Sequence, residues 1–168
     1  MKGIIRSIFL IVIVVIIQSC GAYGFSGADV GEAKTFQVNY ITNNAPIVEP
    51  GIERIFRREL QDLIQNQSSL GLVTEGGDLI YEGEITEYYI APITAVAENT
   101  AAQNRLTISV NIRFINTLES EKDLEQRFSF YYDYDGGQQL VGSTLDVALD
   151  ILYERLTQDI FNATLTSW

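Results

Sequence analysis

Residues 104–116, NRLTISVNIRFIN, alternate between polar and apolar side chains from Arg105 to Phe114. Successive side chains of a β-strand point to opposite faces of the sheet, so this period of two predicts a strand with one buried and one wetted face. The buried face would carry Leu106, Ile108, Val110, Ile112 and Phe114, and the wetted face Thr107, Ser109, Asn111 and Arg113. Such a strand is typical of an antiparallel sheet that packs on one side only.

Other segments with the same period predict four more strands. Residues 34–41 place Phe36, Val38 and Tyr40 on one side. Residues 70–96 predict a short strand, a turn and a long strand, and residues 124–134 predict the last strand. Apolar residues at helical spacing predict a helix over residues 51–66 and another of about 20 residues near the C-terminal end. The predicted order is β-α-β-β-β-β-α.

Two helices that are apolar on one side would cover the apolar face of this sheet. The pattern therefore predicts a single α+β domain over residues 34–168, a two-layer sandwich with two helices on one face of a mostly antiparallel sheet of four to five strands. The opposite face would stay open and polar, which makes it the candidate partner surface. It would display Thr107, Ser109, Asn111, Arg113, Arg127 and Ser129.

The chain starts with a short basic segment and an unbroken apolar run over residues 8–17. This run matches the hydrophobic region of a secretory signal and is shorter than the roughly 20 residues that a membrane-spanning helix needs. The residues around Cys20 resemble a bacterial lipobox, in which the cysteine thiol receives diacylglycerol. We therefore expect a signal peptide over residues 1–19, a lipidated Cys20 and a flexible tether over residues 20–33. The alternative is an ordinary signal peptide followed by a free thiol.

Residues 21–27 carry no charge. The acidic signals that retain lipoproteins at the inner membrane, or send them to the cell surface, are therefore missing from this stretch. We expect a lipid-anchored protein of the outer membrane that faces the periplasm.

The composition argues against catalysis and against nucleic-acid binding. The chain has no histidine and one cysteine, so it lacks the usual acid–base group, and lipidation would consume its thiol. Its net charge of −11 would repel nucleic-acid phosphates. Glu82 and Glu84 share a strand face and could serve glycoside hydrolysis, but a solvated face explains them better. DYDGG at residues 133–137 lacks the ligand spacing of a calcium loop and predicts a turn, so we expect no enzyme activity, metal or cofactor.

Three arginines cluster on the first predicted helix. Arg54 and Arg58 lie one helical turn apart, with Arg57 beside them, and could meet a phosphorylated or acidic ligand. The simpler interpretation is a solvated helix face with local ion pairs such as Arg58 to Asp62, and we favour it.

Several segments together resemble the LptE family of lipopolysaccharide-assembly lipoproteins, in its Bacteroidota form. They are CGAYGFSGA, AKTFQVNYITNNAPIVEP, GGDLIYEGEITEYYIAPI, ENTAAQNRLTISVNIRF, FSFYYDYD and LTQDIFNATLTSW. The resemblance implies two helices on a mostly antiparallel sheet and a non-catalytic role as plug and assembly partner of LptD, the outer-membrane β-barrel that passes lipopolysaccharide to the outer leaflet. Some members also bind lipopolysaccharide through basic loop residues, and here the resemblance offers only Arg105 as a counterpart.

With this resemblance, we expect partner contacts from the hairpin tip near residues 97–105 and from the polar sheet face. The candidate contact residues are Asn99, Thr100, Gln103, Asn104, Arg105, Arg113 and Arg127. The alternative is a general periplasm-facing lipoprotein that binds a glycan or another envelope protein, with Tyr88, Tyr89 and Tyr131 stacking on sugars. The same tyrosines are also explained as ordinary cross-strand pairs.

We predict that the mature chain begins at an acylated Cys20. Each buried methylene of an acyl chain contributes about 0.8 kcal/mol, so several chains on one residue make a lasting anchor. Intact-mass spectrometry after expression in a bacterium that processes lipoproteins should show this start and the added acyl mass, and Cys20→Ser should lack both. A wild-type protein with a free thiol, or one that starts elsewhere, would contradict the prediction.

Overall fold

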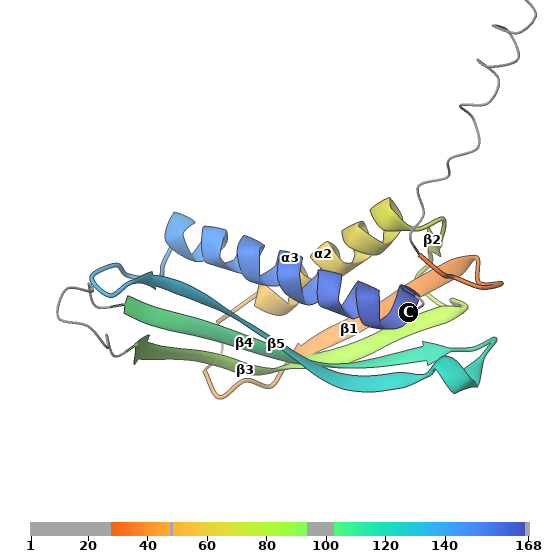
Figure 1. Ribbon diagram of the computed structural model, residues 1–168, viewed down its shortest axis with the longest axis horizontal. Coiled ribbons are helices and arrows are strands. Elements are labelled where there is room, and N and C mark those ends of the chain that lie inside the picture. The colour runs from red at the N-terminus through yellow and green to blue at the C-terminus, as the bar shows by residue number, and fades with distance from the viewer. Residues whose placement is uncertain (1–27, 48, 94–102, 167–168) are drawn as a thin grey trace, which may run out of the picture.

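The structure is a computed structural model that describes residues 28–47, 49–93 and 103–166. Two helices lie on one face of a five-stranded sheet (Figure 1). In chain order the elements are β1 (Thr35–Asn43), α2 (Ile52–Gln67), β2 (Gly71–Leu72), β3 (Leu79–Ile93), β4 (Gln103–Asn116), a short 3-10 turn (Ser120–Lys122), β5 (Leu124–Asp135) and α3 (Ser143–Leu165). This order and the two-layer α+β architecture confirm the fold predicted from the sequence.

The sheet is mixed rather than purely antiparallel. Its strands follow the order β2-β1-β3-β4-β5, and β1 runs parallel to both of its neighbours. The β3–β4 and β4–β5 pairs are antiparallel and long. The parallel pairs follow from the connection after β1, because α2 carries the chain back across the sheet before β2 and β3 begin.

The core lies between the sheet and the two helices. α3 packs on β5 and β4, while α2 packs on β1 and α3. Every apolar residue predicted for the inner face of β4 is at most 1 % exposed. The buried residues of α2 are Ile52, Phe56, Leu60 and Ile64. Full burial of one such side chain stabilises a fold by about 1.5–3 kcal/mol, so this layer supplies much of the folding free energy.

Two β-bulges change which side chains face the core. The β1–β3 register shifts between Val38 and Ile41, so Ile41 is buried and Tyr40 is 64 % exposed. The prediction that Tyr40 faces the core with Val38 was therefore wrong, because an extra residue in a strand reverses the alternation after it. A second shift, between Ile85 and Glu87, turns Tyr88 into the core, where it is 4 % exposed. The expectation of an exposed Tyr88 was wrong for the same reason.

Asp78 joins the start of β1 to the start of β3. Its Oδ2 accepts hydrogen bonds from the Lys34 and Thr35 backbone N–H groups, at 2.9 and 3.0 Å, and from the Thr35 hydroxyl at 2.9 Å. These donors, led by the Lys34 N–H, hold the pKa of Asp78 below its usual value. Just before β1, the Asp29 N–H donates to the Leu165 carbonyl at 2.6 Å and Ala33 is buried, so residues 28–33 lie against the domain.

Two buried tyrosines offer a matched test of hydroxyl satisfaction. The Tyr81 hydroxyl lies 2.9 Å from the Thr164 hydroxyl, whereas the buried Tyr153 hydroxyl has no partner among the described residues. We predict that Tyr81→Phe lowers the free energy of unfolding by about 1 kcal/mol, because a satisfied buried hydrogen bond is lost. Tyr153→Phe should leave it unchanged or raise it by up to about 1 kcal/mol, since only an unpaired polar group is removed. Urea unfolding of the two variants measures both values, and a larger loss for Tyr153→Phe would contradict the assignment.

Stability should also fall in alkali as buried tyrosines ionise. Burial, with Glu49 and Tyr134 nearby, raises the pKa of Tyr88 to about 12. A folded pKa above the unfolded value of about 10 means that the stabilisation is complete below pH 10 and is lost as the pH rises towards 12. We predict a falling free energy of unfolding over this window, with a smaller fall in Tyr88→Phe. Denaturant unfolding at several pH values tests this, and an identical decline in wild type and variant would contradict it.

Candidate partner-binding face

The sheet face turned away from α2 and α3 is not covered by any described element (Figure 1). We call it the open face. Strand alternation and the pairing register place the following side chains on it: Glu82, Glu84, Glu87 and Tyr89 from β3, Gln103, Arg105, Thr107, Ser109, Asn111 and Arg113 from β4, and Glu125, Arg127, Ser129, Tyr131 and Asp133 from β5. Asn104 has the parity of Leu106 and falls on the helix side.

Arg105 is held rigidly at the end of the open face nearest the β3–β4 connection. Its Nε and Nη2 donate to the two carboxylate oxygens of Asp133 at 2.7 and 2.8 Å, and its guanidinium carbon lies 3.6 Å from the centroid of the Tyr131 ring. The hydrogen bond from Arg105 lowers the pKa of Asp133, and the same bond raises the pKa of Arg105. The bidentate pair and the stacked ring fix the orientation of the guanidinium, and the carboxylate of Asp133 neutralises its charge.

A second polar network occupies the centre of the open face. Glu87 Oε2 accepts from Arg127 Nη2 and from the Ser109 hydroxyl, both at 2.8 Å. The Ser109 oxygen also lies 2.9 Å from the Ser129 oxygen. Because the Ser109 hydroxyl has one proton, it donates to Glu87 and accepts from Ser129. Ser109 is fully buried beneath this network, so the expectation that it is displayed to a partner was wrong.

Two exposed tyrosines lie between these clusters. Thr107 pairs with Tyr89 on one side and Tyr131 on the other, so the three side chains form a row across the sheet. Tyr89 and Tyr131 are 53 % and 48 % exposed. Tyrosine and arginine are among the residue types that contribute most binding energy at protein interfaces, so this row is a candidate contact for a partner.

The far end of the open face is a shallow polar hollow of about 270 Å³. Its lining residues are Thr42, Glu82, Gly83, Glu84, Asn111, Arg113 and Glu125. Glu82 accepts a hydrogen bond from the Asn39 amide at 2.9 Å, and Glu84 accepts one from the Asn44 amide. Both carboxylates are thus engaged with neutral amides on a solvated surface, as the simpler interpretation of this pair expected.

The structure places the predicted contact residues unevenly. Arg105, Arg113, Arg127 and Gln103 share the open face, whereas Asn104 does not. Cys20, Asn99 and Thr100 lie outside the described residues. The sequence did not identify Glu87 and Asp133 as ionic partners of Arg127 and Arg105. The bulge before Glu87 changes the sheet face on which this side chain lies, and local alternation does not predict that change. Asp133 is a partner of Arg105 because the β4–β5 register pairs the two residues.

Two further searches concern the described part of the chain. No group of three or more His, Cys, Asp or Glu side chains in it is placed to hold a metal ion. No helix within the same residues combines the length and the apolar character needed to cross a membrane.

Two solved structures share this fold at low sequence identity, and a third is similar at a lower TM-score. A hypothetical protein from Chlamydia trachomatis, CT253, superposes with a TM-score of 0.55 at 9 % identity, covering 79 % of this chain and 98 % of that one. Protein XCC0632 from Xanthomonas campestris gives 0.53 at 9 % identity, with coverages of 86 % and 88 %. The lipoprotein GNA1162 from Neisseria meningitidis gives 0.44 at 12 % identity, with coverages of 77 % and 99 %.

Sequence comparison adds the family. No curated protein matches the chain. The family model of LptE, described as lipopolysaccharide-assembly, matches residues 33–164, which extend from before β1 to the last turn of α3. This match covers most of the sequence, and the chain therefore belongs to the LptE family of lipopolysaccharide-assembly proteins.

Proposed function

We propose that this chain is a lipid-anchored outer-membrane lipoprotein that plugs an LptD-like β-barrel and helps it to assemble. The observation that carries the proposal is the family match over residues 33–164. In this role the protein binds and positions its partner and catalyses no reaction. It uses no cofactor and contacts no nucleic acid.

The open face supplies a suitable surface for such a partner. Two of its arginines are paired within the sheet, Arg105 with Asp133 and Arg127 with Glu87. Charges that are paired in this way can enter a polar barrel lumen without becoming unpaired ions there. Tyr89 and Tyr131 then provide rigid exposed anchors, which lose little conformational entropy on binding.

The β3–β4 connection is the second part of the proposed contact. β3 ends at Ile93, which pairs with Gln103 at the start of β4, and this end of the sheet also carries Arg105 and Asp133. The sequence of residues 94–102, TAVAENTAA, consists mostly of small side chains with Glu98, Asn99 and Thr100 as polar groups, which suits contact with polar barrel walls. We assign the barrel contact to this tip, including Asn99 and Thr100, together with the open face.

The proposal also includes a lipid anchor at Cys20 and a location at the outer membrane. Acylated Cys20 would tether the domain to the outer membrane, with residues 21–27 as the remaining candidate tether before the packed domain. In this proposal, lipopolysaccharide is transported by the complex of this chain with the barrel. Arg105, the residue that the family resemblance offers for direct contact, is occupied by Asp133, so we assign this chain's role to the barrel rather than to the lipid.

A second candidate is a periplasm-facing lipoprotein that binds a glycan or another envelope protein. The paired exposure of Tyr89 and Tyr131 on either side of Thr107 favours it, because sugar rings stack on such aromatic faces. Tyr88, which had been grouped with these tyrosines, is buried and contributes nothing. Co-purification separates the two candidates, since only the first expects a large β-barrel.

We predict that replacing residues 99–103 with a Gly-Ser segment of equal length weakens capture of the barrel while the domain stays folded. The double variant Tyr89→Ser/Tyr131→Ser should reduce capture by about tenfold or more, since anchors of this type cost over 1 kcal/mol each when removed. Pull-down from solubilised outer membranes measures the barrel yield, with circular dichroism as the check on folding.

The matched control is Leu118→Ser/Val141→Ser, which removes two exposed apolar side chains outside the open face. It should capture the barrel at the wild-type yield. Normal capture by both the tip variant and the tyrosine variant would exclude this face as the contact. Recovery of a glycan or a different envelope protein, without any barrel, would favour the second candidate.

A further inference from the structure

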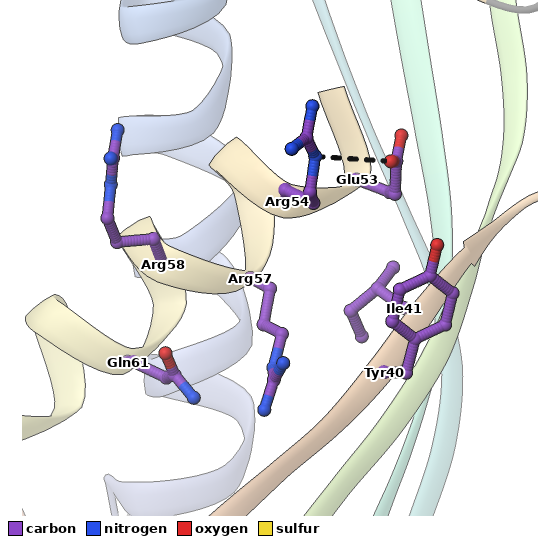
Figure 2. A pocket seen from close by; sticks show the side chains of 7 residues that line it. All are labelled: Tyr40, Ile41, Glu53, Arg54, Arg57, Arg58 and Gln61. Atoms are coloured by element: carbon purple, nitrogen blue, oxygen red, sulfur yellow. Dashed lines mark ion pairs between the residues drawn. The ribbon is translucent and has the colours of Figure 1, made fainter. Parts of the chain in front are cut away.

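A basic cleft lies between α2 and β1, away from the open face. It has a volume of about 220 Å³, and its lining residues are Tyr40, Ile41, Glu53, Arg54, Arg57, Arg58 and Gln61. Figure 2 shows Arg54, Arg57 and Arg58 on two successive turns of α2, with Arg57 directed towards β1 and the Tyr40 ring across the cleft on β1. This volume is smaller than that of most small-molecule pockets, so the cleft fits a chemical group rather than a whole large ligand.

The positive charge of the cleft is not neutralised locally. Arg54 contacts the Glu53 carboxylate only at 3.9 Å and is 78 % exposed in its side chain. Neither Arg57 nor Arg58 forms an ion pair among the described residues, and the expected pair of Arg58 with Asp62 is absent there. Arg105, Arg127 and Lys122, by contrast, each pair with a carboxylate.

Such a cluster is unfavourable for the protein alone. Like charges one helical turn apart, as at Arg54 and Arg58, destabilise a helix. The chain carries 22 acidic residues and a net charge of −11, yet three of its 11 basic residues gather within positions 54–58, and Glu53 is the one carboxylate among the lining residues of the cleft. An anion that enters the cleft would relieve this repulsion.

The geometry of Arg57 gives the cleft a fixed donor. Its Nε donates to the Val38 carbonyl at 3.0 Å. β2 pairs with β1 only at Thr35 and Phe36, so Val38 lies on the edge of β1 beyond that pairing. This bond orients the guanidinium and leaves its terminal N–H groups for a ligand. Arg54 and Arg58 are exposed, and exposed side chains change rotamer rapidly, so both can close over a bound group.

We propose that this cleft binds a phosphoryl group, carried by a phosphomonoester or by free phosphate. Three arginines and Glu53 leave a net charge of about +2, which matches the charge of −1.5 to −2 on a phosphomonoester at neutral pH better than the single charge of a carboxylate. Guanidinium groups bind phosphate oxygens through paired N–H donors, and the Tyr40 ring offers an apolar wall beside them. The proposal is independent of the barrel contact, because the two surfaces share no residue.

The test is a titration of the full-length protein, in neutral detergent and low salt, followed by phosphorus NMR. Inorganic phosphate and glycerol 3-phosphate are the two probes, and acetate is the competing carboxylate. We expect saturable binding of phosphate-type probes that weakens as salt is added, with acetate competing at least about tenfold more weakly. Equal affinity for both probes identifies free phosphate as sufficient, whereas tighter binding of glycerol 3-phosphate identifies an ester such as a lipid headgroup.

Arg54→Gln/Arg58→Gln should weaken binding by about tenfold or more, because two of the three donors are lost. Arg57→Lys keeps the charge but loses the planar donor fork, and should weaken binding to a smaller extent. The control Lys122→Gln/Arg155→Gln makes the same change in net charge outside the cleft and should bind like the wild type. Absence of saturable binding, equal affinity for acetate, or equal losses in the control and the cleft variant would overturn the proposal.

Discussion

The burial of one face of a long twisted sheet is the constraint on which the rest of this structure depends. β4 lies at its centre, with β3 and β5 antiparallel on either side, and its inner residues are almost fully removed from water. Two helices are sufficient to cover that face. The other face has no layer of its own, so its side chains must be compatible with water or with a partner.

The open face meets this requirement by pairing charges across strands. Arg105 reaches Asp133 on β5, while Arg127 and Ser109 converge on Glu87 of β3. These contacts join strands that are far apart in the sequence, and they hold long polar side chains in defined positions. A surface prepared in this way loses less conformational freedom on binding, which is why the tyrosine row beside it is a suitable anchor for a partner.

The arginines of the basic cleft differ from those of the open face in the groups that they contact. On the open face most arginines meet carboxylates, but on α2 three of them remain close together without such partners among the described residues. One of them, Arg57, instead covers a carbonyl on the edge of β1. A charged side chain at a strand edge also discourages pairing with another chain, so the same residue protects the edge and helps to form the cleft.

The sequence by itself determined the layers of this protein, because periodicity reports which faces are apolar. The alternation over residues 104–116 predicted the inner face of β4 correctly, and helical spacing predicted α2 to within one residue at each end. The glycine-rich turn before the last helix and the α+β class followed from the same local signals. Only the tertiary structure decided the parallel pairing of β1, the inward turn of Tyr88, the outward turn of Tyr40 and the partners of Arg105 and Arg127. Bulges, strand order and register depend on contacts between residues up to about 40 positions apart, and local periodicity carries no information about such contacts.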